Sequence, residues 1–394
     1  MRLRKLGKQV SLAGQRVLFR FDGNVPIEKG RAVDGPHGRI ARAAVDLDWL
    51  IQRGARVVAM THLGRPDGKR RSAYSLKPVA KRLSSLLGIK VPVSSALTGS
   101  RVERLVSSLK NGQVLLLENL RFDPREEKND KTFAQELARL GDLYVNDAFA
   151  VNHRAHTSVQ ALAQELPAYA GFLLENEIAV LSQSIERARH PFVLVMGGLK
   201  VETKLPVMEH LAAQVDVILV GGALATTFAV ADGKAVGRSV YDKEAVEVIR
   251  YLSKSLRQKI LLPEDVVVAS SLRKDAKTHV ALADQVGAKD RIVDIGPKTI
   301  ARFEQEIKRA KMVVWNGPLG YCEIGAFCRG SEKIAQAIAH RTGAATTIVG
   351  GGDTGPVLER LKLADRFTLL STGGGAMLDF LAGHSLPGLE PLER

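Results

Sequence analysis

The sequence predicts an α/β protein with two doubly wound parallel-sheet domains that are joined by a helix and separated by a cleft. Short apolar runs alternate with amphipathic stretches along the chain, which is the pattern of repeated βαβ units. Glycine clusters follow several of the apolar runs, as they do where parallel strands end in tight βα turns. The length of 394 residues also suits two hydrophobic cores better than one.

The first half of the chain supplies the strands and helices of one domain. Apolar runs predict strands at Arg16–Phe21, Ala55–Thr61, Gln113–Glu118 and Leu143–Asn146. Amphipathic stretches predict helices at Ile40–Arg53, Pro78–Leu87 and Lys131–Arg139. The stretch Gly171–Arg189 has helical periodicity and no helix breaker after its first residue. We therefore expect a helix over 171–189 that joins the first domain, 1–170, to a second one.

The second half repeats the pattern and predicts a second Rossmann-like sheet. Its expected strands are Phe192–Met196, Val215–Val220, Val266–Ala269, Met312–Trp315, Thr346–Val349 and Phe367–Leu370. We expect these strands to build a domain over 190–375.

The composition is that of an ordinary globular protein, with 45% hydrophobic and 25% charged residues. Cys322 and Cys328 lack the spacing of a zinc site or a disulfide framework, so we expect neither and favour a reducing cytoplasm. The N-terminus has no apolar signal-peptide core, and the uncharged apolar run Val217–Ala231 is too short to span a bilayer. No oligomerisation motif is evident, and we expect a monomer.

The net charge of +15 leaves two kinds of anionic partner open. Basic residues bind nucleic acid, or they line a cleft for anionic small molecules. The lysines and arginines are dispersed, and aromatic residues make up only 5% of the chain, which leaves little for base stacking. The small-molecule interpretation is therefore favoured. A nucleic-acid-binding protein would instead lose affinity steeply with salt and would ignore ATP.

The glycine turns of the second half predict a nucleotide site. Gly350–Gly352 follow an apolar run and precede Asp353 and Thr354. Bare glycines at the start of a helix offer backbone N–H groups to a phosphate. Asp353 is able to hold a divalent cation, and Thr354 is able to cap the helix or touch a phosphate. Similar turns occur at Gly197–Gly198, Gly221–Gly222 and Gly373–Gly375; together they indicate a nucleotide at the carboxyl edge of a parallel sheet.

The first half instead places cationic and polar side chains after its strands. Guanidinium groups bind phosphate and carboxylate in a planar, bidentate manner, and Asp22 and Asn24 suit a hydroxyl. Arginines from several loops therefore indicate a site for a small polyanion. The segments are Arg20–Asn24, His62–Pro66, Asn119–Phe122 and His153–His156, with Arg39 at the start of the first helix.

These motifs, in this order and spacing, resemble those of phosphoglycerate kinases over essentially the whole chain. The resemblance implies a two-domain glycolytic kinase that moves a phosphoryl group reversibly between 1,3-bisphosphoglycerate and ADP, giving 3-phosphoglycerate and ATP. The nucleotide would bind as its magnesium complex, and the C-terminal segment 376–394 would return to the first domain. The matching segments are Arg20–Pro26, Thr61–Pro66, Glu118–Phe122, Asn146–Ser158, Gly197–Lys204, Trp315–Glu323, Gly350–Thr354 and Ser371–Ala376.

The resemblance also implies which residues bind each substrate. Glu323 would take the ribose hydroxyls, and Asp353 would take the magnesium. The glycerate positions are Asp22, Asn24, Arg39, His62, Arg65, Arg121 and Arg154, and the nucleotide positions are Lys200, Lys204, Gly222, Glu323, Gly351, Gly352, Asp353 and Thr354.

Phosphoryl transfer requires positioning and charge neutralisation rather than a nucleophilic side chain. We expect Arg39 and Lys200 to act on the transferring group, one from each domain, with backbone N–H groups at Gly352 and Gly375 assisting. Because these donors come from both domains, the site would be complete only after hinge bending closes the domains and excludes water.

Several positions depart from the usual pattern of the family. Gly23 stands where Phe is common, His37–Gly38 stand where Asp-Thr precedes the arginine, Thr203 replaces an aspartate beside Lys204, and Ile292 replaces a glycine. These changes bear on turnover and on nucleotide affinity. They leave a divergent paralogue that acts on another acyl phosphate as the alternative function.

Other classes of protein fit less well. No Gly-Lys pair is followed by Ser or Thr, as a P-loop kinase requires, and a dinucleotide dehydrogenase would not need the arginines of the first half. A metal site formed by His62, His153 and His156 is disfavoured. His62 is more simply a substrate contact, and the other two histidines more simply hold arginines or their loop in place.

Overall fold

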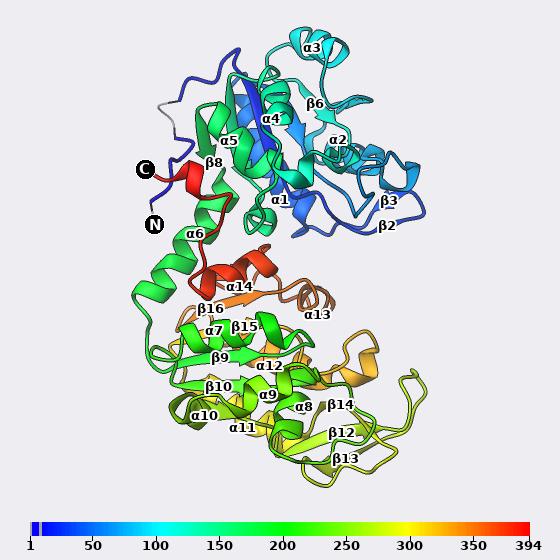
Figure 1. The fold of residues 1–394 in the computed structure, drawn as a ribbon, viewed down its shortest axis with the longest axis vertical. Helices are drawn as coiled ribbons and strands as arrows, with labels where there is room; N and C mark the ends of the chain where they lie inside the picture. Colours follow the sequence, from blue (N-terminus) through cyan, green and yellow to red (C-terminus); the bar gives the residue numbers. More distant parts are fainter. Residues whose placement is uncertain (1, 8–9) are drawn as a thin grey trace. The chain divides into compact units, whose positions relative to one another are not determined.

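The structure is a computed structural model that describes residues 2–7 and 10–394, and it divides into two compact units. Unit 1 contains residues up to Ala179 together with Ser385–Arg394, and unit 2 contains Val180–His384. The helix α6 (Phe172–Glu186) begins in unit 1 and ends in unit 2 (Figure 1). The helix α14 (Gly375–Leu381) belongs to unit 2.

Unit 1 is built on a six-stranded sheet of order β5–β6–β4–β1–β7–β8, in which all neighbouring strands are parallel. The central strand β1 is buried from its second residue onward, because helices cover both faces of such a sheet. The strands are β1 (Arg16–Phe21), β4 (Arg56–Met60), β5 (Val93–Ser94), β6 (Val114–Leu117), β7 (Leu143–Asp147) and β8 (Ala168–Ala170).

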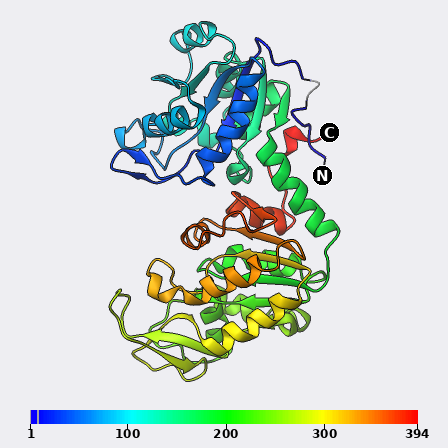
Figure 2. The ribbon, with the colours of Figure 1, turned by 180° about the vertical axis from the view of Figure 1, so that it is seen from behind.

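Helices lie on both faces of this sheet. Figure 1 shows α4 and α5 on one face, and Figure 2, seen from behind, shows α1 and α2 on the other. A short antiparallel hairpin precedes α1. The helices are α1 (Arg39–Gln52), α2 (Lys77–Leu87), α3 (Ser100–Ser107), α4 (Lys131–Ala138) and α5 (Leu162–Glu165), and the hairpin strands are β2 (Ile27–Glu28) and β3 (Arg31–Ala32).

Unit 2 contains a second six-stranded parallel sheet, of order β11–β10–β9–β15–β16–β17. The chain order runs outward in both directions from the adjacent strands β9 and β15, so the topological switch point of the sheet lies between them. The strands are β9 (Phe192–Met196), β10 (Val217–Val220), β11 (Ile260–Leu261), β15 (Met312–Asn316), β16 (Thr346–Gly350) and β17 (Leu369–Leu370).

The helices of unit 2 also divide between two faces. Figure 1 shows α7, α8 and α9 in front of the sheet, and Figure 2 shows α11 and α12 behind it. The predicted fold class, two doubly wound parallel-sheet domains, is therefore confirmed. The helices are α7 (Leu205–His210), α8 (Gly222–Ala231), α9 (Ala245–Arg250), α10 (Lys254–Lys259), α11 (Pro297–Arg309), α12 (Arg329–Ala339) and α13 (Gly355–Arg360), besides α14.

One predicted strand belongs to a different sheet. The run Val266–Ala269 was expected in the parallel series, but β12 (Asp265–Ala269) pairs antiparallel with β13 (Thr278–Leu282) and β14 (Arg291–Ile295). The prediction was wrong because an apolar run of this length does not reveal the direction of its partners. This small sheet matters for function, since β14 forms one wall of the cavity described below.

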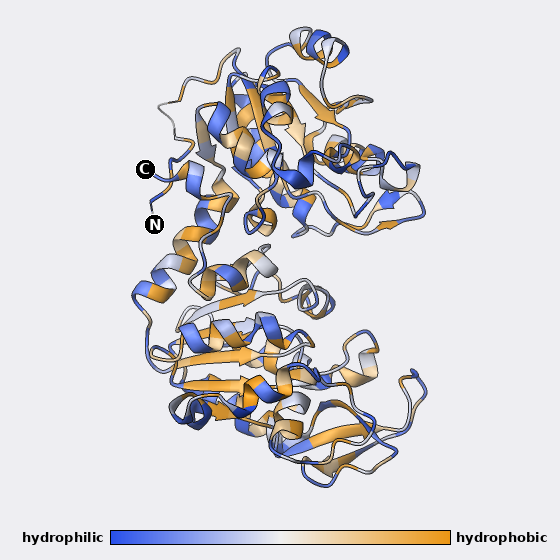
Figure 3. Ribbon diagram, in the orientation of Figure 1, coloured by the Kyte–Doolittle hydropathy of each residue, from blue (hydrophilic) through white to orange (hydrophobic). Residues whose placement is uncertain are grey.

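Each unit has its own hydrophobic core. In unit 1 the core joins Phe19 of β1 to Ile40 and Leu47 of α1, and in unit 2 Trp315 of β15 packs with Phe303 of α11. Figure 3 shows that the strands of both sheets are largely hydrophobic and that the helices carry hydrophilic faces. Short 3₁₀ helices occupy Ser72–Tyr74, Leu120–Phe122, Glu126–Lys128, Phe149–Val151, Val201–Thr203, Gly325–Phe327 and Glu390–Leu392, and a π-helix occupies Thr157–Ala161.

Candidate functional site

The charged side chains of unit 1 gather at the carboxyl edge of its sheet. Asp22, His62 and Arg121 follow β1, β4 and β6, and Arg39 is the first residue of α1. The strands β6, β4 and β1 are consecutive neighbours in the sheet. Parallel strands that lie side by side end at the same edge, so the segments that follow them meet there.

Asp22, Asn24 and Arg39 form one polar group. Arg39 Nη1 lies 2.8 Å from Asp22 Oδ2 and donates to the Asn24 carbonyl oxygen at 3.0 Å. Asp22 Oδ1 accepts the Asn24 N–H at 3.0 Å, and Asn24 Oδ1 accepts the Gly64 N–H at 2.9 Å. These contacts fix the direction of the Arg39 side chain, which remains 30% exposed and is able to donate to a ligand.

His62 and His156 lie among arginines. His62 is 4% exposed, and its Nδ1 is 3.1 Å from Arg20 Nη2. Burial, followed by the charges of Arg20 and Arg121, lowers the pKa of His62 well below its ordinary value. Burial and then the charges of Arg121 and Arg154 lower the pKa of His156 to about 3. Both imidazoles are therefore neutral at pH 7, and the positive potential of the surrounding arginines suits an anionic ligand.

Arg121 and Arg154 belong to the same cluster. Arg121 is buried, and its Nη1 donates to the Gly64 carbonyl oxygen at 2.7 Å. Burial and the positive charge of Arg154 both lower the pKa of Arg121. Arg154 Nε donates to His153 Nε2 at 3.2 Å. Arg65 directly follows Gly64 and is exposed to solvent.

Sequence reasoning missed the carboxylate that caps α1. Asp34 accepts the N–H groups of Ile40 at 3.0 Å and Ala41 at 3.1 Å, which satisfies donors at the start of the helix. A Cβ at Gly38 would lie 2.1 Å from Asp34 Oδ1, so the glycine permits this approach. His37 and Gly38, which depart from the family pattern, thus stand beside a cap by Asp34 that holds Arg39 at the helix start. The Asp-Gly-Pro turn at 34–36 was the signal that could have revealed it.

The sequence assigned Arg20 no individual role within the predicted polyanion site. Arg20 is 1% exposed, and its Nε donates to Ser158 Oγ at 3.1 Å. Ser158 Oγ in turn donates to Glu126 at 2.6 Å. Burial lowers the pKa of Arg20, and the charge of Glu126 raises it. Arg20 therefore supports His62 from within the domain.

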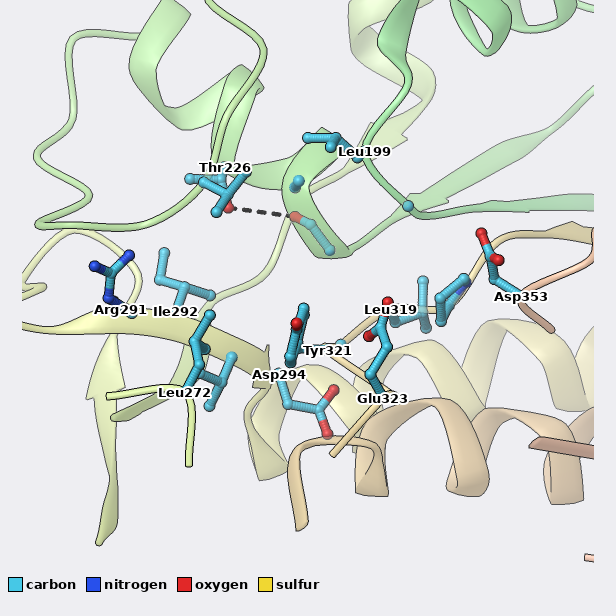
Figure 4. Close-up of a pocket in the computed structure, with 17 residues that line it drawn as sticks. Leu199, Thr226, Leu272, Arg291, Ile292, Asp294, Leu319, Tyr321, Glu323 and Asp353 are labelled. Carbon is cyan, nitrogen blue, oxygen red and sulfur yellow. Dashed lines mark hydrogen bonds between the residues drawn. The ribbon is translucent and has the colours of Figure 1, made fainter. Parts of the chain in front are cut away.

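A cavity of about 270 Å³ lies at the carboxyl edge of the sheet in unit 2 (Figure 4). The turns after β9, β10 and β15 and the strand β14 supply its walls. Asp353 lies at one end, Glu323 near the middle, and Arg291 and Ile292 at the other end. The cavity therefore has a carboxylate at one extremity and a guanidinium at the opposite one.

The walls between these ends are largely apolar. Leu199 is 52% exposed, Val240 51%, Tyr321 40% and Leu272 38%, although all four are large hydrophobic side chains. Exposed apolar groups that converge on one cavity indicate a ligand with a flat apolar part. A nucleoside has such a part, and its phosphates require a polar extremity.

The glycine turns serve close packing more than phosphate binding. The N–H groups of Gly197, Gly198, Gly221 and Gly222 donate to backbone carbonyl oxygens, so they are not available to an anion as the sequence suggested. A Cβ on Gly197 would lie 2.1 Å from the Pro318 carbonyl oxygen, which only glycine avoids. These four N–H groups are thus occupied, because the turns at the strand ends pack closely against one another.

The turn after β16 differs. Among the described residues, the N–H groups of Gly351 and Gly352 have no protein acceptor, and Gly352 is exposed. Gly351 has a φ of +105°, which favours glycine. Gly375 is the first residue of α14 and is also exposed. The structure therefore leaves the backbone donors at 351–352 open to a ligand.

Lys204 is the buried cation near the Asp353 end of the cavity. It is 8% exposed, and its ammonium donates to Asn316 Oδ1. Burial lowers the pKa of Lys204 to about 8, the charge of Asp353 raises it, and the charge of Lys200 lowers it. Asn316 Nδ2 is buried without a hydrogen-bond partner. A buried cation beside an unpaired amide donor suits an anionic oxygen.

The remaining predicted nucleotide residues occupy different positions. Glu323 lines the cavity and is exposed, and Lys200 is exposed directly before the short helix at 201–203. Thr354 does not cap α13 with its side chain. It is 0% exposed, and its hydroxyl accepts the Gly317 N–H at 3.2 Å instead. The interpretation of Thr354 as a cap is therefore wrong, because the turn after β15 takes its hydroxyl.

The two cysteines are paired, contrary to the expectation from their spacing. Cys322 and Cys328 form a disulfide that encloses residues 323–327. The turn through Gly325–Phe327 brings the two ends of this loop together. The bridge follows Tyr321 and encloses Glu323, both of which line the cavity. Local sequence spacing did not reveal this pairing, because it depends on the path of the loop.

In residues 2–7 and 10–394, no three His, Cys, Asp or Glu side chains are grouped so as to hold a metal ion. Within the same described ranges, no helix combines the length and apolar character needed to cross a membrane.

The fold and the two sites define a class of protein. A doubly wound parallel sheet with an arginine cluster at its carboxyl edge, and a second sheet with a nucleotide-sized cavity, are typical of a two-domain α/β phosphotransferase. Comparison with known proteins identifies the family. The family model for phosphoglycerate kinase matches residues 8–384, and the chain belongs to the phosphoglycerate kinase family.

Individual relatives are similar to this chain over nearly its full length. The chain is 45% identical over 388 residues to a phosphoglycerate kinase of Herpetosiphon aurantiacus, covering 98% of both chains. It is 45% identical over 397 residues to one of Chloroflexus aurantiacus, covering 99% of both. The structure of phosphoglycerate kinase from Coxiella burnetii is similar, with a TM-score of 0.84, 38% identity and 99% coverage of both chains. That from Pyrococcus horikoshii has a TM-score of 0.88 at 30% identity, covering 99% of this chain and 98% of the other.

Proposed function

We propose that the chain catalyses reversible phosphoryl transfer between 1,3-bisphosphoglycerate and ADP, giving 3-phosphoglycerate and ATP in glycolysis. In this direction the bond between phosphorus and the carboxyl oxygen of the acyl phosphate breaks, and a terminal phosphate oxygen of ADP bonds to the phosphorus. The family match over residues 8–384 carries the proposal. It also disfavours a divergent paralogue that acts on another acyl phosphate.

Unit 1 would bind the glycerate. The polar group of Asp22, Asn24 and Arg39 offers hydrogen-bond acceptors and a guanidinium within one hydrogen-bonded network. A hydroxyl of the substrate would donate to the Asp22 carboxylate. The substrate's own carboxylate and phosphate groups need cations. His62 and the remaining arginines of the predicted set, Arg65, Arg121 and Arg154, would supply the rest of the contacts.

Unit 2 would bind the nucleotide as its magnesium complex. Lys204 and the unpaired Asn316 amide support a phosphate near Asp353, and Glu323 suits the ribose hydroxyls. Asp353 is an exposed carboxylate on the cavity, and Mg²⁺ takes one or two protein carboxylates when phosphates and water complete its shell. Asp353 would hold the magnesium, whose positive charge would offset that of the phosphates.

Arg39 and Lys200 would act on the transferring phosphoryl group, and the N–H groups at Gly352 and Gly375 would assist. Both side chains remain accessible to a ligand. Donors placed around the equatorial oxygens stabilise the charge of the transition state without forming a covalent intermediate. Because the acyl phosphate and the nucleotide must meet, hinge bending is part of this proposal.

The test is a coupled assay of the purified chain with 3-phosphoglycerate, ATP and magnesium that follows acyl-phosphate formation. Arg39→Ala and Lys200→Ala should each lower kcat by roughly 10²–10⁴, or about 3–5 kcal/mol. Lys243→Ala is the matched control, since Lys243 is an exposed lysine outside the cavity and its loss should leave kcat unchanged. Losses below about fivefold in both site variants would refute the catalytic assignment.

We also propose a compartment and an oligomeric state for the enzyme. A glycolytic role favours the cytoplasm, although the Cys322–Cys328 disulfide is unusual in a reducing compartment. We also propose a monomer, which sedimentation equilibrium would test. A mass near 42.7 kDa is expected, and a concentration-independent multiple of it would overturn this assignment.

A further inference from the structure

Arg20 is a buried cation in contact with His62, and it is not among the residues proposed to contact the substrate. It belongs to β1 and is 1% exposed, and its Nη2 lies 3.1 Å from His62 Nδ1. A guanidinium in a protein interior is costly unless its charge is balanced and its donors have partners. The partners of Arg20 therefore indicate what the residue is arranged to do.

The other two nitrogens of the guanidinium are also hydrogen-bonded. Arg20 Nε donates to Ser158 Oγ at 3.1 Å. Arg20 Nη1 donates to the Phe21 carbonyl oxygen and, at 3.4 Å, to Thr61 Oγ1. These bonds fix the plane of the guanidinium, because its N–H groups point in set directions within that plane. The Nη2 donor is thereby directed at His62.

A buried carboxylate supports this arrangement. Glu126 is 1% exposed, its Oε1 accepts the Ser158 O–H at 2.6 Å, and its Oε2 accepts the Ser158 N–H at 2.9 Å. Because the single hydroxyl proton of Ser158 goes to Glu126, the lone pairs of Ser158 Oγ remain for Arg20. Burial lowers the pKa of Arg20, and the charge of Glu126 opposes this change. Glu126 therefore helps to keep Arg20 both charged and in place.

The hydrogen bond between Arg20 and His62 has one possible direction. A guanidinium has donors and no acceptor, so His62 Nδ1 accepts with its lone pair. The imidazole is neutral, because burial and then the charges of Arg20 and Arg121 lower the pKa of His62 well below its ordinary value. A neutral imidazole that accepts at one nitrogen carries its proton on the other. The proton of His62 therefore lies on Nε2, which makes no hydrogen bond within the described part of the chain.

The tautomer determines which kind of group His62 is able to bind. With the proton on Nε2, the side of the ring away from Arg20 is a hydrogen-bond donor and suits an anionic oxygen. With the proton on Nδ1, Nε2 would present a lone pair, which suits a hydroxyl and repels an anionic oxygen. The Asp22 carboxylate already offers an acceptor to a hydroxyl. Arg20 thus gives His62 the opposite role from that of Asp22.

We propose that Arg20 is a positioning residue that fixes the ring of His62 in its Nε2–H tautomer and so makes His62 a donor to an anionic oxygen of the substrate. The inference rests on the proposed function, because it assumes that unit 1 binds the glycerate. Arg20 acts through His62 and does not itself touch the substrate. The tautomer is a property of the ligand-free chain, so its measurement does not depend on turnover.

The first measurement is a nitrogen-15 NMR spectrum of the full-length chain with labelled imidazoles, recorded without substrate between pH 6 and pH 8. The His62→Gln chain identifies the signals of His62 by their loss. We expect one protonated and one unprotonated ring nitrogen, with the proton on Nε2, and no titration of the ring across this range. This spectrum tests the tautomer in the native chain, whether or not any variant folds.

The second measurement compares Michaelis constants in a variant that loses both buried charges. Arg20→Met combined with Glu126→Gln leaves neither charge unbalanced and frees the His62 ring. Both tautomers should then be populated. The KM for 3-phosphoglycerate should rise about threefold to tenfold, since the ring must be ordered on binding, while the KM for ATP should change less than about twofold.

The matched control removes another arginine and carboxylate pair from the same unit. Arg16 is the first residue of β1, and its Nη2 lies 2.6 Å from Asp142 Oδ1. Arg16→Met combined with Asp142→Asn therefore removes an equal pair of charges from the opposite end of the strand that carries Arg20. The tautomer of His62 and both KM values should be unchanged in this control.

The outcomes separate this inference from the proposed function. A proton on Nδ1 or a cationic His62 ring in the native chain would overturn the inference. So would a pure Nε2–H tautomer in the variant without Arg20, or equal increases of both KM values there, which would indicate a general loss of structure. If the native chain turns over 3-phosphoglycerate in any of these cases, the proposed function stands. An Nε2–H tautomer in a folded native chain without turnover would leave the tautomer assigned and overturn both the proposed function and the substrate contact.

Discussion

Lys204 provides a quantitative test of the nucleotide site. Its ammonium is 8% exposed, and burial lowers its pKa to about 8 in the ligand-free chain, despite the opposing charge of Asp353. Bound nucleotide phosphates would bring several negative charges beside it and raise this pKa. We therefore expect nucleotide binding to take up a proton at alkaline pH.

The size of the effect follows from linkage. Binding requires the protonated form, so the dissociation constant grows as the neutral form becomes populated above pH 8. At pH 9 about one chain in ten carries the ammonium, and the affinity should be about tenfold weaker than at pH 7, or about 1.4 kcal/mol. Below pH 7 the affinity should be nearly independent of this group.

The assay is titration calorimetry of magnesium ADP at pH 7, 8 and 9, in two buffers whose ionisation enthalpies differ, so that proton uptake is counted directly. Lys204→Arg is the matched control, because arginine stays charged throughout this range, and its pH profile should be flat. Lys204→Met should bind weakly at every pH. A change below about twofold in the native chain between pH 7 and 9, or an equal slope in Lys204→Arg, would refute the reasoning.

Three further predictions concern the cap, the buried acids and the disulfide. Asp34→Ala should lower the free energy of unfolding by about 1 kcal/mol, as measured by thermal unfolding. The same variant should also have a lower kcat for 3-phosphoglycerate in the coupled assay. Burial and then the charge of Asp46 raise the pKa of Asp147 well above its ordinary value. Folded Asp147 therefore holds a proton that the unfolded chain releases, so the stability of the native chain should fall as pH rises from about 4. The thermal midpoint of Asp147→Asn should fall less over the same pH range. Reduction of Cys322–Cys328 should free two thiols and weaken ADP binding about threefold to tenfold, since the Glu323 loop must then be ordered on binding.

Each of these predictions has a contrary result. Unchanged kcat in a destabilised Asp34→Ala chain would separate the cap from the position of Arg39. Parallel pH profiles of the native chain and Asp147→Asn would mean that Asp147 is ionised in the folded state. For the disulfide, a Cys322→Ser chain that binds ADP as tightly as the oxidised native chain would show that the bridge does not support the cavity.

The sequence predicted the elements that local pattern controls. The strands Arg16–Phe21 and Phe192–Met196 have their predicted bounds, because a continuous apolar run between polar residues suits a buried parallel strand. Arg39 begins α1 as predicted. The order of motifs identified the family, since each motif combines a strand end with a polar or glycine-rich turn.

The tertiary structure alone decided features that join distant parts of the chain. The direction of β12, the Cys322–Cys328 bridge and the Asp34 cap depend on the path of intervening loops. The N–H groups of the paired glycines donate to carbonyl oxygens that come close to them only in the folded sheet. The lowered pKa of Lys204 arises from burial, and the place of Arg291 opposite Asp353 arises from the packing of β14 beside the main sheet. A sequence pattern records neighbours along the chain, whereas burial, pairing and electrostatic environment depend on neighbours in space.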